Sequence, residues 1–164
     1  MKLVIGLFII SIIILLLPRF LPSNQPNKEN KALGLVNGHL SPCPNKPNCI
    51  NSEIITKNQT AKDGTNQSTL VLHFTEKNQA QILPLAKTIL LNMGATLIAE
   101  EKNYLAVTFR SKIFKFVDDF ELHQNNHTQQ LYVRSASRLG YSDFGVNQQR
   151  VEFFLEQLKK QLAH

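Results

Sequence analysis

The stretch RSASRLGYSDFGVNQQR, residues 134–150, decides how this chain folds. Its first residues read as a strand, Gly140 and Gly145 mark a turn, and Asn147 opens a helix. Three arginines, an aspartate and several hydroxyls are crowded into the same stretch. Polar groups at this density beside apolar runs are costly to bury unless they bond one another or a ligand. The stretch therefore predicts a strand, a turn and a helix that share one polar cluster.

The regions before this stretch predict the rest of a small α+β domain. The expected elements are, in chain order, a strand at 70–74, a helix from Asn78 to Met93, strands at 95–100, 104–110, 116–123 and 130–138, and a helix from Asn147. Pro84 stands early in the first helix, so either the regular helix begins close to it or its first turns are kinked. Adjacent strands with separate helices predict an antiparallel sheet of about five strands, in the order strand, helix, four strands, helix, with two helices packed on one face.

Apolar residues recur in these elements with the spacing of buried faces. On the two helices they are Ile82, Leu85, Ala86, Ile89 and Met93, and then Val151, Phe154, Leu155, Leu158 and Leu162. In the first hairpin, Leu97 and Ala99 are expected to share a face with Leu105 and Val107. In the second hairpin, the shared apolar face carries Phe116, Phe120, Leu122, Leu131 and Val133. These faces predict one core between helices and sheet.

The opposite face of the second hairpin carries acids and arginines. If this hairpin turns on residues 125–128, Asp119 lies opposite Arg134, and the two can form a structural ion pair. A register shift of two residues would place Glu121 opposite Arg134, so an acid–arginine pair survives either register. Asp118 falls on the apolar face, where a carboxylate must accept hydrogen bonds or take up a proton.

Two interpretations of the polar residues remain open. Asp118 has candidate partners in Ser135, Ser137 and an arginine of residues 143–150. In the structural interpretation, the charged residues form a network that ties the last helix to the sheet. In the functional interpretation, arginines and hydroxyls bind an anion beside the N-terminus of the last helix. The candidate ligand-binding residues are then Asp118, Ser135, Ser137, Arg138, Ser142, Asp143, Asn147 and Arg150.

Other chemistry is sparse. Each of the five histidines is expected to face solvent, although His123 and Glu121 can share a strand face. There is no glycine-rich phosphate loop and no nucleophile elbow, so we expect no catalytic set, metal site or cofactor. The net charge of +6 arises mainly in residues 1–50, which hold five basic residues and one acidic residue. The remainder has no basic stripe with interleaved aromatics, so nucleic acid is not an expected partner.

Cys43 and Cys49, in the run SPCPNKPNC, are the two cysteines of the chain. Downstream of an export segment, such a close pair favours a disulfide, which would restrict the unfolded chain by roughly 2 kcal/mol. A zinc site, a catalytic redox pair and free thiols are the alternatives. Zinc lacks a second ligand pair at usable spacing, and a redox pair usually has two intervening residues rather than five.

The N-terminal segment is apolar and uncharged from Leu3 to Leu17. Extended to Leu21, it approaches the roughly 20 residues of a membrane-spanning helix. No small-x-small cleavage site follows, which favours an uncleaved anchor over a cleaved signal. The expected organisation is an anchor or signal at 1–21, a tether at 22–39 and an extracytoplasmic domain at 40–164. Such a protein would be single-pass in the inner membrane, with its domain facing the periplasm or another extracytoplasmic space.

Three motifs, in this order, resemble one family. They are LSPCPNKPNCINS (residues 40–52), DDFE (118–121) and RSASRLGYSDFGVNQQR (134–150). The combination is similar to family 1499 of the domains of unknown function (DUF1499), which occurs in bacterial envelope proteins and some plastid proteins. The resemblance implies no reaction and no ligand. Gln148 stands where a typical member carries arginine, which weakens the case for a strongly anionic ligand.

These features predict a membrane-anchored extracytoplasmic module that binds or scaffolds. Its expected partners are the membrane, through the N-terminal segment, and an anionic small molecule or an envelope protein. The alternative is an envelope hydrolase or transferase, in which Asp118 acts as an acid and arginines hold an anionic substrate. An enzyme needs Asp118, Ser135 and Arg138 to open together into a pocket, whereas a scaffold can leave them sealed between sheet and helix.

Overall fold

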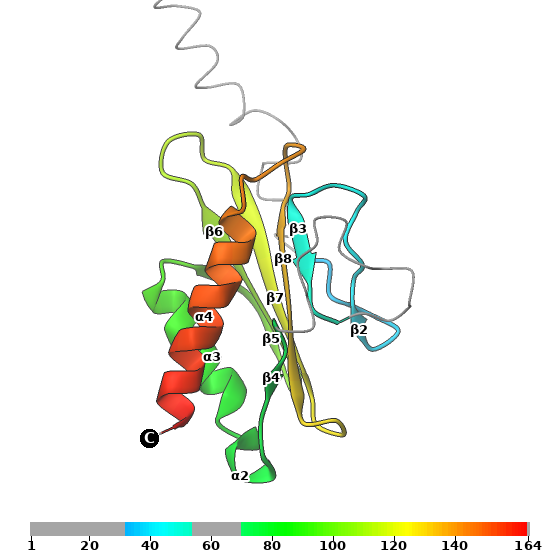
Figure 1. Cartoon of the computed structure of the whole chain (residues 1–164), viewed down its shortest axis with the longest axis vertical. Coiled ribbons are helices and arrows are strands. Elements are labelled where there is room, and N and C mark those ends of the chain that lie inside the picture. Colours follow the sequence, from blue (N-terminus) through cyan, green and yellow to red (C-terminus); the bar gives the residue numbers. More distant parts are fainter. Residues whose placement is uncertain (1–31, 54–69, 164) are drawn as a thin grey trace, which may run out of the picture.

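A computed structural model of the chain describes residues 32–53 and 70–163 (Figure 1). In chain order its elements are β1 (Leu35–Val36), β2 (His39–Leu40), β3 (Cys49–Asn51), β4 (Leu72–His73), α2 (Glu76–Gln79), α3 (Ile82–Asn92), β5 (Thr96–Glu101), β6 (Tyr104–Arg110), β7 (Val117–Asn125), β8 (Gln130–Ser137) and α4 (Val146–Leu162). The predicted α+β class is confirmed. The main sheet has six antiparallel strands, in the order β3-β8-β7-β6-β5, with β4 also paired to β8.

The sheet is covered differently on its two faces. Helices α3 and α4 lie side by side on one face, as expected (Figure 1). On the other face the β1–β2 hairpin packs against β7 and β8. All of this hairpin except Leu40 thus falls in the segment 22–39, which the sequence assigned to the tether. In the described residues no helix is both long and apolar enough to cross a membrane, and the expected anchor at 1–21 lies outside them.

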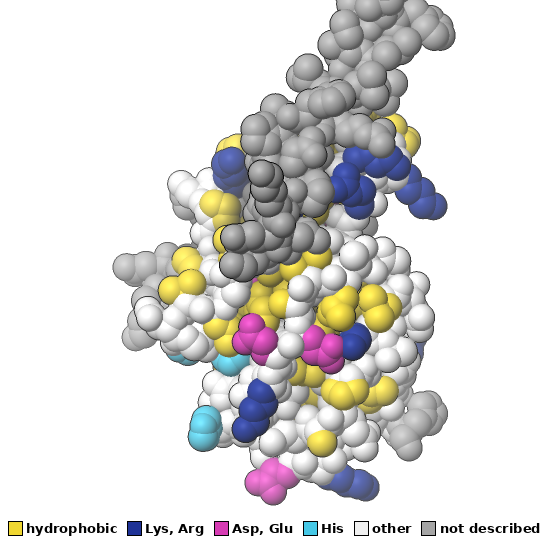
Figure 2. Space-filling view, turned by 180° about the vertical axis from the view of Figure 1, so that it is seen from behind, with side chains coloured by type: hydrophobic (Ala, Val, Ile, Leu, Met, Phe, Trp, Pro, Cys, Tyr) yellow, Lys and Arg dark blue, Asp and Glu magenta, His cyan; other side chains and the backbone are white. Residues whose placement is uncertain are grey.

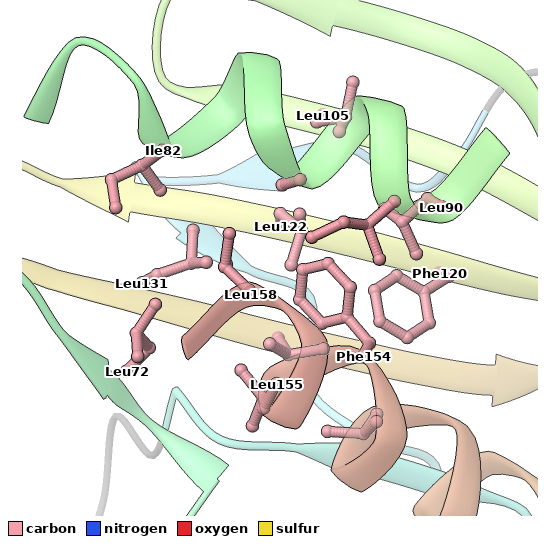
Figure 3. Packing of buried hydrophobic residues seen from close by; sticks show 14 of the residues in the cluster. Leu72, Ile82, Leu90, Leu105, Phe120, Leu122, Leu131, Phe154, Leu155 and Leu158 are labelled. Atoms are coloured by element: carbon pink, nitrogen blue, oxygen red, sulfur yellow. The ribbon is translucent and has the colours of Figure 1, made fainter. Parts of the chain in front are cut away.

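The core lies between the two helices and the sheet. Figure 3 shows Phe154 and Leu158 of α4 beside Phe120 and Leu122 of β7. Phe154 and Phe120 meet edge to face, with their ring centroids 5.3 Å apart. Burying a side chain of this size contributes about 1.5–3 kcal/mol. The helices are therefore held on the sheet mainly by apolar packing.

Helix α3 begins close to Pro84, one of the two predicted alternatives. Asn78 does not cap it but lies in the short helix α2, whose N-cap is Thr75. A new helix then starts at Ile82, so Pro84 falls in its first turn, where a missing backbone N–H leaves no bond unmade. Ile82, Ala86 and Ile89 are buried as predicted. Leu83 and Leu90 are buried as well, whereas Leu85 and Met93 are only partly buried.

The predicted end of α3 at Gly94 is confirmed. Gly94 adopts a left-handed backbone with φ of 90°. Its N–H donates to the Leu91 carbonyl, and the following Ala95 N–H donates to the Leu90 carbonyl. These two bonds satisfy carbonyls that a helix end leaves without partners, which is the Schellman arrangement that favours glycine.

A bulge in β5 overturns one predicted pairing. Leu97 lies opposite Val107 as expected, but the register then shifts, and Ala99 lies opposite Ala106. An extra residue in one strand moves the following side chains to the other face of the sheet. Ala99 therefore packs with Ala106 in a small second cluster beside Leu40, not with the helix-side core.

The β7–β8 hairpin pairs two residues out of the expected register. Asn125 lies opposite Gln130, and Glu121 lies opposite Arg134. Asn125 opens the turn itself, since its side-chain oxygen accepts the N–H groups of His127 and Thr128 at 3.0 and 3.2 Å. A two-residue shift leaves every side chain on its predicted face, so the apolar face survives. Phe116 is the exception, because it precedes β7 and is exposed.

Candidate functional site

The sheet divides the single polar cluster that the sequence predicted into two. Asp118 and Asp119 are consecutive in β7, so their side chains point to opposite faces. Asp118 bonds Arg150 of α4, under the helices, whereas Asp119 bonds Arg138 on the other side. We call the groups around Asp118 the α4 cluster and those around Asp119 the hairpin cluster.

Asn147, fully buried at the start of α4, is the centre of the α4 cluster. Its side-chain oxygen accepts from Ser135 Oγ at 2.5 Å and from Arg150 Nη1 at 2.9 Å. Its amide nitrogen donates to Ser137 Oγ at 3.0 Å and to the Asn48 carbonyl at 3.3 Å. One amide thereby joins β8, α4 and the loop before β3, and all four of its bonds are made within the protein.

Asp118 finds its partner in the last helix, as one of the sequence alternatives predicted. Arg150 Nη2 lies 2.9 Å from Asp118 Oδ2, and both side chains are mostly buried. The Arg150 guanidinium also sits over the Phe109 ring, 4.5 Å from its centroid. Both contacts hold Arg150 against the sheet, as the structural interpretation requires.

The N-terminus of α4 is occupied by the protein's own carboxylate. Asp143 accepts the backbone N–H of Gly145 at 3.1 Å and that of Asn147 at 2.8 Å. Ser142 Oγ similarly accepts the Phe144 N–H at 3.2 Å. A carboxylate here is stabilised by the partial positive charge of the helix end. Asp143 and Ser142 therefore satisfy the backbone groups that the functional interpretation reserved for an anion.

The hairpin cluster is built on a buried ion pair, Glu121–Arg134, which is the pair expected from the shifted register. Arg134 Nη1 bonds Glu121 Oε2 at 2.7 Å, so the expected partner Asp119 is wrong because of the two-residue register shift. Glu121 Oε1 also accepts from the Tyr104 hydroxyl at 2.6 Å and from the Gly34 N–H at 3.1 Å. Burial and the nearby Glu121 charge raise the pKa of the Tyr104 hydroxyl, which therefore remains a proton donor.

Arg138 forms a second ion pair in the hairpin cluster. Its Nε and Nη2 atoms bond the two oxygens of Asp119 at 2.9 and 2.7 Å, a two-point contact. The hydrogen bond to Asp119 raises the pKa of the Arg138 guanidinium above its already high value. Arg138 is thus engaged within the protein and faces away from Asp118 and Ser135.

A group of three residues, His39, Glu53 and His123, was missed by the sequence analysis. Nδ1 of His39 and Nδ1 of His123 lie 2.8 and 2.9 Å from Glu53 Oε1. The Leu40 N–H donates to Glu53 Oε2 at 2.8 Å. The expectation that His123 faces solvent is wrong, since only 7% of it is exposed. The sequence correctly placed Glu121 and His123 on one face of the strand. However, His123 bonds the carboxylate of Glu53, which lies 70 residues away in sequence.

The charge of Glu53 sets the proton positions in this group. Burial alone would raise its pKa, but hydrogen bonds from His123, the Leu40 N–H and His39 hold the pKa below its ordinary value. An ionised carboxylate only accepts hydrogen bonds, so each Nδ1 must carry a proton. In a neutral imidazole the other nitrogen, Nε2, is then the one that can accept a proton. His39, whose side chain is 43% exposed, is the accessible member.

The two cysteines are joined, as the sequence favoured. Cys43 and Cys49 form a disulfide with a Cα–Cα distance of 5.6 Å. The ring closes directly before β3 and holds Asn48, whose carbonyl bonds Asn147 in the α4 cluster. Across residues 32–53 and 70–163, no three histidine, cysteine or acidic side chains are grouped so as to hold a metal ion.

Comparison with known proteins agrees with the motif resemblance. No curated protein matches the sequence. A family model described as "Protein of unknown function (DUF1499)" matches residues 39–158, from β2 to the buried Leu158 of α4. The match includes the disulfide, the α4 cluster and the side chains of the hairpin cluster, whereas Gly34 lies before it. Because it covers more than half of the chain, this protein belongs to the DUF1499 family.

Proposed function

We propose that this protein is a membrane-anchored extracytoplasmic module that binds or scaffolds envelope components. One observation carries the proposal: Asp118 and Ser135 lie under α4, whereas Arg138 lies on the opposite face of the sheet with Asp119. The three side chains that an enzyme would have to present together are separated by the sheet. Each one already has a partner within the domain. The domain's contacts with other molecules are therefore expected at its surface.

The proposed location is supported by the disulfide and by the N-terminal sequence. Disulfides persist in oxidising compartments and are rare in the cytosol. The apolar run from Leu3 and the basic residues Lys28 and Lys31 suit an anchor beside anionic headgroups. An extracytoplasmic domain on a short tether combines both features.

Thermal melts of two arginine variants test whether these residues are structural. We expect Arg138→Gln and Arg150→Gln each to lower the melting temperature, because each leaves a mostly buried aspartate without its cation. Lys159→Gln, an exposed change near the end of α4, serves as the matched control and should have little effect. Unchanged or raised melting temperatures for the two arginine variants would instead favour a vacant anion site, as in the enzyme alternative.

Location is tested on the full chain in bacterial cells. After alkaline carbonate treatment the protein should remain with the membranes. In intact cells whose outer permeability barrier has been opened, a membrane-impermeant thiol reagent should label the cysteines only after reduction. Release by carbonate would indicate a cleaved signal. Labelling without reduction would show free thiols outside the cytoplasm and contradict the disulfide, whereas no labelling even after reduction would place the domain in the cytoplasm.

A second candidate function is that of a hydrolase or transferase. The observation that favours it lies at Glu53 and His39, not at Asp118 as the sequence predicted. A buried carboxylate that bonds Nδ1 of a histidine and leaves Nε2 to accept a proton is the usual arrangement of a general base. Glu53 and the half-exposed His39 have this arrangement. The full chain can be assayed with p-nitrophenyl acetate and p-nitrophenyl phosphate. Turnover that disappears in His39→Gln, with an unchanged melting temperature, would support this candidate over the first.

A further inference from the structure

One end of the domain exposes a group of large apolar side chains. They come from the β6–β7 loop at 111–116, the β8–α4 loop and the first residue of α4. The exposed fractions are 68% for Ile113, 41% for Phe114, 37% for Phe116, 71% for Tyr141, 93% for Phe144 and 45% for Val146. Single exposed apolar residues are ordinary on soluble domains, but a contiguous group marks an interaction surface. We call these six residues the apolar end.

Backbone pairing places the two loops together. Arg110 and Val117 are paired across the mouth of the β6–β7 loop, and Asp118 is paired with Ser137 at the end of β8. The Arg138 N–H donates to the Val117 carbonyl at 3.0 Å. Figure 1 shows both loops at the upper end of the sheet, where α4 begins. The two loops that carry the apolar end therefore begin side by side at this end of the sheet.

Phe144 is held outward by an unfavourable backbone. Its φ is 55°, in the left-handed region that bulky side chains rarely adopt. It is almost fully exposed, so no packing of its ring within the domain offsets this strain. Backbone strain of this kind concentrates at functional sites. It therefore indicates that the Phe144 ring is held ready to contact another molecule. Phe114 and Phe116 add a stacked pair of rings, with centroids 5.6 Å apart.

The charge around the apolar end is basic. Arg110, Lys112 and Lys115 lie in or beside the β6–β7 loop. Of the acids nearest to these loops in the chain, Asp118 is bonded to Arg150 and Asp143 to the N-terminus of α4. In the view of Figure 2, lysine and arginine side chains lie at the upper end without acidic neighbours in view, whereas lower on this face basic and acidic side chains are mixed.

We propose that the apolar end rests on an anionic bilayer, with its aromatic rings in the headgroup region and its basic residues on the lipid phosphates. Aromatic side chains flanked by lysine and arginine are the usual composition of surfaces that lie in the membrane interface. The expected tether supports this occupant over a distant protein. Ten residues, 22–31, separate the apolar N-terminal segment from the first described residue, and they span at most about 35 Å when fully extended. This inference rests on the proposed membrane anchor.

The chain contains no tryptophan, so a single introduced tryptophan reports its own surroundings. The full chain carrying Phe144→Trp is reconstituted into vesicles of phosphatidylethanolamine and phosphatidylglycerol, with brominated acyl chains as quencher. We expect its emission to shift to shorter wavelength and to lose most of its intensity to the bromines. The matched control is His127→Trp, an exposed position in the turn at the opposite end of β7. Its emission should remain that of a tryptophan in water, without quenching.

Charge is tested in the same vesicles. Lys112→Glu in the Phe144→Trp chain, or replacement of phosphatidylglycerol by phosphatidylcholine, should reduce the quenching. Full quenching in both cases would show that the basic residues do not hold the apolar end on the membrane. It would contradict the proposed contact with an anionic surface.

The remaining outcomes separate this inference from the proposed function. If the protein floats with the vesicles but Phe144→Trp stays unshifted and unquenched, the anchor stands and the apolar end is not on the membrane. A blue shift without quenching would mean that a second copy of the chain covers the apolar end, which also overturns the inference. If the protein stays in the lipid-free fraction, the anchor itself is refuted, and the membrane-resting end with it.

Discussion

The face of the sheet under α3 and α4 is buried with apolar side chains, whereas the face under the β1–β2 hairpin buries charged side chains beside a small apolar cluster. Strand β7 supplies both. Phe120 and Leu122 point to the helices, and Asp119, Glu121 and His123 point to the hairpin. Alternating side chains of one strand thus support two layers of different chemistry.

The two layers are expected to respond differently to change. Apolar packing is non-directional and depends on the area removed from water. The hairpin instead donates backbone N–H groups, from Gly34 and Leu40, to the buried carboxylates of Glu121 and Glu53. Such bonds are strong only while the acceptor is charged and the geometry is kept. The helix layer should therefore be sensitive to volume, and the hairpin layer to charge and pH.

The largest effect is expected in the helix layer. Phe154→Ala should lower the free energy of unfolding by about 3–5 kcal/mol, because it empties a fully buried site between α4 and β7. The neighbouring Phe153→Ala is the control, since Phe153 is half exposed, and it should cost less than about 1 kcal/mol. Urea unfolding measures both. Equal losses would show that the helix layer is not held by packing at Phe154.

The next effect is expected in the hairpin layer, at the buried ion pair. Arg134→Met should cost about 3 kcal/mol, because it leaves Glu121 charged and buried without its cation. Combined with Glu121→Gln, the loss should be smaller than the sum of the two single losses. Lys160→Met breaks the exposed pair with Glu156 and should cost under about 1 kcal/mol. Strict additivity of the Arg134 and Glu121 changes would mean that the two side chains are not coupled.

A smaller effect is expected from the disulfide that borders both layers. Reduction of Cys43–Cys49 should lower the free energy of unfolding by about 2 kcal/mol or less, since the closed ring is short. The Cys43→Ser/Cys49→Ser variant should match the reduced protein. A loss well above that of Arg134→Met would mean that the ring positions Asn48 for the α4 cluster, beyond its effect on the unfolded chain.

The smallest effect is expected in the pH dependence of the hairpin layer. Glu53 has a folded-state pKa below its ordinary value of 4.5, so its contribution is complete above pH 4.5. That contribution is lost as the pH falls through the lower folded-state value. Glu53→Gln should therefore flatten the pH dependence of stability below pH 4.5, whereas the exposed Glu152→Gln should leave it unchanged. An unaltered slope in Glu53→Gln would show that its charge does not hold the hairpin.

Much of the helix layer could be predicted from local pattern. The apolar spacing of α4 and the alternation in β7 and β8 identified most of the buried side chains. The match of Asp118 to an arginine of the last segment followed from a buried carboxylate that needs a partner. Less of the hairpin layer could be predicted, because residues 33–36 are only a brief apolar interruption in a segment rich in Asn, Pro, Lys and Gly that resembles a tether. Their strands are stabilised by carboxylates from other parts of the chain, not by a pattern of their own.

The sequence by itself predicted the α+β class, favoured the disulfide, and identified which side chains of β7 and β8 share a face. Period-two alternation is unchanged by an even shift in register, so the apolar and charged faces were predictable even though the pairing was not. Only the tertiary structure decided that Glu121, not Asp119, meets Arg134, and that Glu53 meets His123 across 70 residues. Such contacts depend on how distant segments close over one sheet. The local sequence predicts that a buried polar side chain needs a hydrogen-bond partner. Which partner lies within reach is determined only by the folded chain.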